Sequence, residues 1–263
     1  MKSNNPYEIF EIDHLSPSSI NTFIQSPAKY VMRYLFDYKT VGGPAMWRGT
    51  ATDEAIGKYF EYETKTDLTI PECVRYAEDL YDQLYKSFKD KHPDQKVDMD
   101  KHIKEAKQVG IYTKLALDFY KDLGQPTAYQ KKIELQLDSI PIPIIGYIDL
   151  LYPNLVRDIK TTARYPYEVS SAHARQMALY AKAEDCSPVL DYIYVTTRNK
   201  EVVTKPVNDV EERIKEIERV GLTIMNLLSL SNDKYEIANY VYPDLDTWLW
   251  SKEEKEFAKT IWS

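Results

Sequence analysis

The chain has 263 residues, a net charge of −7 and a hydrophobic fraction of 43%, values typical of a globular protein that buries a sizeable core. The acidic balance argues against nucleic-acid binding over the whole surface, although a local basic groove is compatible with it. Two distant cysteines argue against a disulfide framework or a zinc site. Because we find no signal peptide and no long apolar run, we expect no membrane span and a cytoplasmic protein, in the host cytoplasm if the protein is encoded by a phage.

The N-terminal segment predicts two short helices that begin in the same way. Ser16 and Ser26 each precede a proline, so that a capping hydroxyl stands before the residue best suited to the first helical position. We expect these helices to span residues 17–25 and 27–37.

The next hundred residues also predict helices. Thr50 is a candidate cap for a third helix that runs to about Tyr62. Apolar residues at helical spacing then predict two longer helices within 71–123, around a polar break. No residue of this stretch suggests chemistry, and we interpret 63–125 as a helical insertion or cap.

After residue 126 the pattern changes to strands that alternate with helices. Pro153 and Asn154 separate two apolar runs by two turn residues, the signature of a hairpin. The predicted strands are 129–137, 142–152, 155–161, 190–197 and 202–206, and the predicted helices are 168–183 and 210–230. This order predicts an α/β fold in which a mixed central sheet is flanked by helices.

Two acids and a lysine on the predicted hairpin carry the strongest chemical signal. Asp149 lies on one strand, and Asp158 and Lys160 share a face of the next because strand side chains alternate. Adjacent carboxylates repel each other unless a cation lies between them, and Mg²⁺ prefers such oxygen ligands. The backbone carbonyl of Ile159 offers a further oxygen, and Lys160 could orient or help to deprotonate a water.

The alternative is an exposed hairpin with ordinary solvated charges. Apolar residues on both sides of these acids, such as Leu150 and Val156, favour a central pair of strands instead. Unpaired charges would be costly there, so metal chemistry is the better interpretation.

The helix that follows presents Gln176 and Tyr180 on one face, four residues apart, beside Arg175. These side chains could hold a phosphate or a base near a metal. Taken alone, this spacing is more typical of a half-buried ring and its neighbour than of a substrate-binding pair.

Together these motifs resemble the RecB-type branch of the PD-(D/E)XK nuclease superfamily. The resemblance rests on Gly-Tyr-Ile-Asp ending at Asp149, on Asp-Ile-Lys-Thr-Thr from Asp158, on Gln-Met-Ala-Leu-Tyr from Gln176, and on the opening Leu-Ser-Pro-Ser-Ser from Leu15. It implies a restriction-endonuclease-like core with additional N-terminal and middle helices, in one domain over 1–263.

The resemblance also implies an activity and its residues. Asp149 and Asp158 would bind two divalent ions, Mg²⁺ or Mn²⁺, and Lys160 would complete the catalytic set. Thr161, Arg175, Gln176 and Tyr180 would contact the substrate. The implied partner is single- or double-stranded DNA with a free end, and the implied reaction is exonucleolytic hydrolysis in recombination, repair or replication, in a phage or a cell. A structure-specific endonuclease, or a degenerate module that only binds nucleic acid, remains open.

Three positions depart from the family pattern or add to it. Asp53 stands where many relatives have a metal-binding histidine, and it is either a ligand or an acid in a helical first turn. Glu134 is the one candidate for an additional acid before the hairpin. Relatives with an iron–sulfur cluster have cysteine at the position of Ser26 and in the tail, where this chain has none, so we expect no cluster, with tryptophan packing joining the two ends of the chain.

Overall fold

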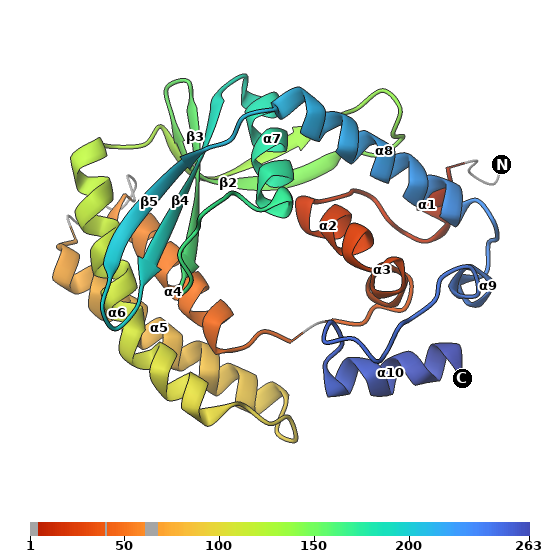
Figure 1. Ribbon diagram of the computed structural model, residues 1–263, viewed down its shortest axis with the longest axis horizontal. Helices are drawn as coiled ribbons and strands as arrows, with labels where there is room; N and C mark the ends of the chain where they lie inside the picture. Colours follow the sequence, from red (N-terminus) through yellow and green to blue (C-terminus); the bar gives the residue numbers. More distant parts are fainter. Residues whose placement is uncertain (1–4, 40, 61–67) are drawn as a thin grey trace.

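The computed structural model describes residues 5–39, 41–60 and 68–263, and a single mixed sheet runs through the centre of these residues (Figure 1). Its strands lie side by side in chain order: β1 (Ala128–Leu135), β2 (Ile144–Tyr152), β3 (Leu155–Thr162), β4 (Ser187–Val195) and β5 (Lys200–Pro206). β3 and β4 are parallel, and every other neighbouring pair is antiparallel. The expected α/β fold is confirmed, and so is the two-residue hairpin, because Tyr152 pairs with Leu155.

Helices cover both faces of this sheet. One face carries α7 (Ser171–Glu184), which connects β3 to β4, with α8 (Val210–Leu228) and α2 (Pro17–Gln25) packed against it. The other face carries α4 (Pro44–Tyr59) and α6 (Met99–Tyr120), and α5 (Ile70–Lys91) packs on both of them. A 3₁₀ turn, η1 (Lys121–Leu123), ends this layer. The sheet therefore separates two apolar clusters, one beneath α7 and α8 and one beneath α4 and α6.

The two ends of the chain form a third region (Figure 1). It holds α3 (Pro27–Tyr34), α9 (Lys234–Ala238) and α10 (Lys252–Trp262), while α1 (Pro6–Ile9) contacts α8. Trp250 is buried with Ala28 and Met32 of α3, as the sequence led us to expect, whereas Trp248 is 89% exposed. Trp262 packs against the same cluster and is partly buried, so two of the three tryptophans of the tail contribute to that packing.

The helix bounds correct one prediction. α4 begins at Pro44 with Gly43 as its cap, six residues before the expected start at Thr50, because proline already has the helical φ angle. Thr50 and Asp53 consequently lie inside the helix, and the capping-box interpretation of this pair is wrong. The expected end at Tyr62 and the first residues of the proposed 63–125 insertion lie outside the described ranges. Within those ranges, no helix combines the length and apolar character needed to cross a membrane.

Candidate active site

Strands β2 and β3 diverge at the point where the acidic residues begin. Their pairing ends at Leu150 and Arg157, so Asp149 and Asp158 are the first residues beyond the paired ladder. The peptide N–H of Ile159, which has no partner on β2, donates to Oδ2 of Asp149 at 2.8 Å. A carboxylate thus replaces the missing ladder bond and is fixed between the two strands.

Asp158 and Lys160 lie on the face of β3 that α7 covers. Asp158 is 1% exposed, and its Oδ2 forms an ion pair with the Lys160 ammonium. The amide of Gln176 donates to Oδ1 of Asp158 at 3.0 Å and to the Tyr180 hydroxyl at 2.9 Å. One oxygen of this buried carboxylate thus accepts a hydrogen bond, whereas Oδ2 accepts none and is compensated only by the charge of Lys160.

Gly146 explains how Tyr180 comes so close to β2. A β-carbon at this position would lie 2.6 Å from the ring of Tyr180, nearer than any side chain tolerates. The glycine at the start of the Gly-Tyr-Ile-Asp motif therefore makes room for the ring that completes the site. Gly146 and Tyr180 are 34 residues apart in sequence, and each needs the other in order to pack at this position.

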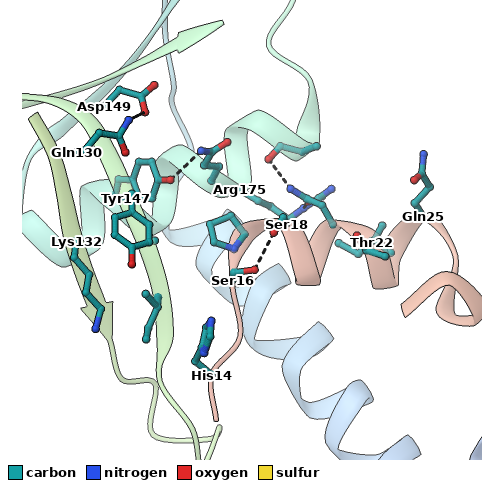
Figure 2. Close-up of a pocket in the computed structure, with 18 of the residues that line it drawn as sticks. His14, Ser16, Ser18, Thr22, Gln25, Gln130, Lys132, Tyr147, Asp149 and Arg175 are labelled. Carbon is teal, nitrogen blue, oxygen red and sulfur yellow. Dashed lines mark hydrogen bonds between the residues drawn. The ribbon is translucent and has the colours of Figure 1, made fainter. Parts of the chain in front are cut away.

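Asp53 approaches from α4, on the other side of the opening between the strands. Its Oδ2 accepts from the Gln130 amide at 2.8 Å, and the same nitrogen donates to Oδ1 of Asp149 at 3.1 Å (Figure 2 shows the second bond). The Tyr129 hydroxyl donates to the backbone oxygen of Asp53 at 3.1 Å. Oδ1 of Asp53 is buried and accepts no hydrogen bond.

The charges at this site perturb one another. Burial raises the pKa of Asp53 to about 7, with the carboxylates of Asp158 and Glu54 adding to the effect. Burial, and then the charges of Asp158 and Asp53, raise the pKa of Asp149 well above its usual range. For Lys160, burial lowers the pKa, but Asp158 and Asp149 more than offset this and leave it raised, so its ammonium is charged at neutral pH.

This donor set fits a divalent cation. Three carboxylates that repel one another, one of them with a buried free oxygen, are an arrangement that a hard cation relieves. In the described part of the chain, however, no three His, Cys, Asp or Glu side chains are already gathered as a ligand group. Neutral oxygens, such as the Ile159 carbonyl, and waters would have to complete the coordination.

A groove of about 940 Å³ opens beside these residues (Figure 2). Gln130, Asp149, Gln176 and Tyr180 line one end, and α2 forms a wall that includes Ser18. Lys132, Tyr147 and His14 line the side away from Asp149. The groove is large enough for part of a nucleic-acid strand.

Thr161 and Arg175 have structural partners. The Thr161 hydroxyl accepts from the guanidinium of Arg48 at 3.1 Å. Arg175 lines the groove, but its guanidinium donates to Asn21 at 2.8 Å and to Glu216 at 3.2 Å. Its charge is therefore already engaged between α2 and α8.

Glu134 lies apart from the other acids. It is exposed, 3.8 Å from the Lys132 ammonium, and it pairs with Ile145, four positions along β2 from Asp149. The structure thus leaves it outside the site.

Sequence reasoning missed Gln130 and Arg48 as functional candidates. Gln130 lies opposite Asp149, between the Tyr129–Leu150 and Lys131–Ile148 pairs. The irregular connection between β1 and β2 hides this register in the sequence. Arg48 belongs to the Arg-Gly-Thr run before Asp53, but this run does not predict where in the fold the arginine lies.

Comparisons with known proteins identify the family of the chain and relatives of its fold. A family model of the PD-(D/E)XK nuclease superfamily matches residues 14–240. A solved structure from Eubacterium rectale, named "Putative exonuclease", is similar at 12% identity and a TM-score of 0.55, covering 87% of this chain and 86% of that one. The structure of SSO0001 has 13% identity and a TM-score of 0.37, over 76% of this chain and 96% of that one. No curated protein matches the chain. At these identities, the likeness to the Eubacterium rectale protein shows the fold alone.

Proposed function

The chain belongs to the PD-(D/E)XK nuclease superfamily, and from this premise we propose that it is a metal-dependent deoxyribonuclease of the RecB-type branch that degrades DNA from a free end. The observation that supports the proposal is that Asp149 and Asp158 face each other just beyond the last paired residues of β2 and β3, with Lys160 paired to Asp158 and Asp149 lining an open groove. We interpret 1–263 as one nuclease domain in which 63–125 is a helical insertion, and the activity as serving recombination, repair or replication.

Three carboxylates of the site would hold Mg²⁺ or Mn²⁺, as one ion or two. Asp149 and Asp158 are the principal ligands, and Asp53 contributes its buried free oxygen in place of a histidine. The Ile159 carbonyl completes the set. When bound, the cation supplies charge neutralisation at the phosphate and activation of a water.

Lys160 provides a fixed positive charge at the same place. Because Asp158 and Asp149 keep its ammonium protonated at neutral pH, it acts as a donor that orients the attacking water or the phosphate, not as a base. Gln176 holds Asp158 from the side of α7 and also donates to the Tyr180 hydroxyl, and both side chains line the groove. They are placed to contact the substrate strand, while Arg175 fixes α2 as the wall of the groove.

The substrate path follows from the shape of the groove. A DNA strand that enters the groove past Tyr147 and Lys132 reaches Asp149. The turn of α2 that contains Ser18 then lies on the opposite side of this DNA strand (Figure 2). Tyrosine faces stack bases without sequence preference, and a lysine and a histidine can contact phosphates. The groove therefore fits a single strand, whether it is free or melted from a duplex end.

The test is cleavage of end-labelled linear DNA, single- and double-stranded, with Mg²⁺ or Mn²⁺. We expect metal-dependent release of short products, reduced at least about 100-fold in Lys160→Ala and Asp158→Ala, the scale of losing one group that stabilises the transition state. Glu134→Ala is the matched control and should cleave like the wild type. A covalently closed circle should survive.

Other results would overturn parts of this proposal. Cutting of the closed circle would make the protein an endonuclease with the same site. Intact DNA binding without cleavage under either metal would make it a nucleic-acid-binding module.

A further inference from the structure

Gln130 adopts a backbone conformation that the rest of β1 does not share. Its φ angle is +47°, in the left-handed region that residues other than glycine rarely enter. The pairs on either side, Tyr129 with Leu150 and Lys131 with Ile148, keep one common register, so no residue is inserted. Strain confined to one residue is typical of positions where the side chain has a task.

The contacts of the Gln130 side chain indicate its role. Its Nε2 lies 2.8 Å from Oδ2 of Asp53 and 3.1 Å from Oδ1 of Asp149, so one amide joins carboxylates from α4 and β2. Gln130 is half-buried at the end of the groove, with these acids behind it. The amide hydrogens carry partial positive charge to both oxygens, beside the Tyr129 hydroxyl 3.4 Å from Oδ2 of Asp53 and the charge of Lys160, which acts on both acids.

We propose that Gln130 is a switchable ligand of the metal site, whose amide bridges the two carboxylates when the site is empty and turns its oxygen to the cation when the site fills. The proposal rests on the metal-dependent function above. A cation between Asp53 and Asp149 repels amide hydrogens but attracts an amide oxygen, and half a turn of the terminal torsion exchanges the two. Amide carbonyls are hard oxygen ligands of the kind that such cations accept.

The distances agree with this exchange. In an octahedral site with metal–oxygen bonds of 2.0–2.1 Å, neighbouring ligand oxygens stand about 2.9 Å apart. The Gln130 nitrogen is 2.8 Å and 3.1 Å from the two carboxylate oxygens. After the turn, the amide oxygen occupies a point that suits a ligand adjacent to both. This additional oxygen would supplement the three carboxylates, which do not by themselves form a gathered ligand group.

The experiment measures Mn²⁺ binding by calorimetry, with no DNA present. We expect Gln130→Ala to weaken Mn²⁺ at least about tenfold, the lower end of what loss of a supporting group costs a metal site. Gln130→Glu keeps an oxygen at the same reach and should bind Mn²⁺ at least as tightly as the wild type. Gln25→Ala, a glutamine that lines the same groove from α2, is the control and should leave the affinity unchanged.

Gln130→Asn guards against misfolding of the alanine variant. Asparagine tolerates the left-handed backbone, but its amide is one methylene shorter, so the variant should fold and still bind Mn²⁺ more weakly. Unchanged affinity in both Gln130→Ala and Gln130→Asn would reduce the residue to a structural tie. Tighter binding in Gln130→Ala would make the amide a competitor of the metal. Either result overturns the proposal.

The outcome for the proposed function is read separately. If Mn²⁺ binds the wild type and is lost in Asp149→Asn, the metal site stands whatever Gln130 does. If the wild type binds no Mn²⁺, the metal site and the ligand role of Gln130 fail together, and cleavage then decides the function.

Discussion

Asp53 shows how one residue would couple the proposed metal site to pH. Its pKa is raised from 3.8 to about 7, first by burial and then by Asp158. Between pH 3.8 and about 7, Asp53 therefore binds more protons in the folded protein than in the unfolded chain. The free energy of unfolding of the metal-free protein consequently falls as the pH rises across that window. Asp149, whose pKa is raised well above its usual range by burial and by the charges of Asp158 and Asp53, acts in the same direction.

We therefore expect the melting temperature of the metal-free protein to decrease between about pH 4 and pH 7, and to decrease less in Asp53→Asn. Mn²⁺ affinity should have the opposite trend and increase with pH, because the cation competes with the proton. Thermal melts and Mn²⁺ titrations at three pH values measure both. If the melting temperature falls equally steeply with pH in Asp53→Asn, a group other than Asp53 causes the pH dependence.

At the residue scale, the sequence predicted the acids of the hairpin well and their neighbours poorly. Pro153 and Asn154 set the turn length, and the turn length sets the register, so the placement of Asp149 near Asp158 followed from local chemistry. Gln130 depends instead on the register across an irregular connection and on an unusual φ angle. Neither has a local signature in the chain.

At the scale of elements, α4 connects the helical layer to β3, the strand that carries Asp158 and Lys160. Arg48 forms a buried ion pair with Glu105 of α6 and donates to the backbone oxygen of Thr161 at 3.2 Å. Its guanidinium also stacks on the Tyr112 ring, 4.2 Å from the centroid. One side chain therefore ties α4, α6 and the end of β3 together, beside Lys160.

Glu105→Ala should lower the free energy of unfolding by about 3–5 kcal/mol, because it leaves the Arg48 charge buried without its partner. Both side chains are about 5% exposed, so solvent offers little compensation. Urea unfolding measures the loss, and the double variant Arg48→Met/Glu105→Leu should recover part of it by removing both charges. A loss under about 1 kcal/mol, the range of an exposed pair, would contradict the buried role.

The element predictions succeeded where the start signal was local. Ser16 caps α2 through a capping box with Ser19, and the predicted bounds of this helix match the observed ones. The start of α4 was misplaced because Thr50, a good cap by residue type, lies within a helix that Pro44 had already begun. Residue type alone does not decide between two possible starts.

At the scale of the whole molecule, the N- and C-terminal segments are held together by a buried ion pair. The Lys29 ammonium lies 2.8 Å from Glu254 of α10 and also donates to the backbone oxygen of Leu249. It stands 5.1 Å from the centroid of the Trp250 ring. The sequence predicted that tryptophan packing would join the ends. It did not predict the ion pair between Lys29 and Glu254, which are 225 positions apart.

The contact between the chain ends should weaken in acid. Burial raises the pKa of Glu254, but the hydrogen bond from Lys29 and the Ser251 cap more than offset this and leave the pKa lowered. A carboxyl with a lowered pKa stabilises the fold above its unfolded value of 4.5, and this contribution is lost as pH falls through the folded value. We expect Lys29→Ala to cost about 3–5 kcal/mol near neutral pH, since it leaves the buried Glu254 charge with the Ser251 N–H and with Arg33 3.5 Å away as its cation. Hydrogen exchange should then be faster in α10 than in the sheet.

Lys252→Ala, which removes a 3.9 Å pair between exposed side chains of the same helix, is the matched control. Equal exchange rates in the two variants would show that apolar packing alone joins the ends.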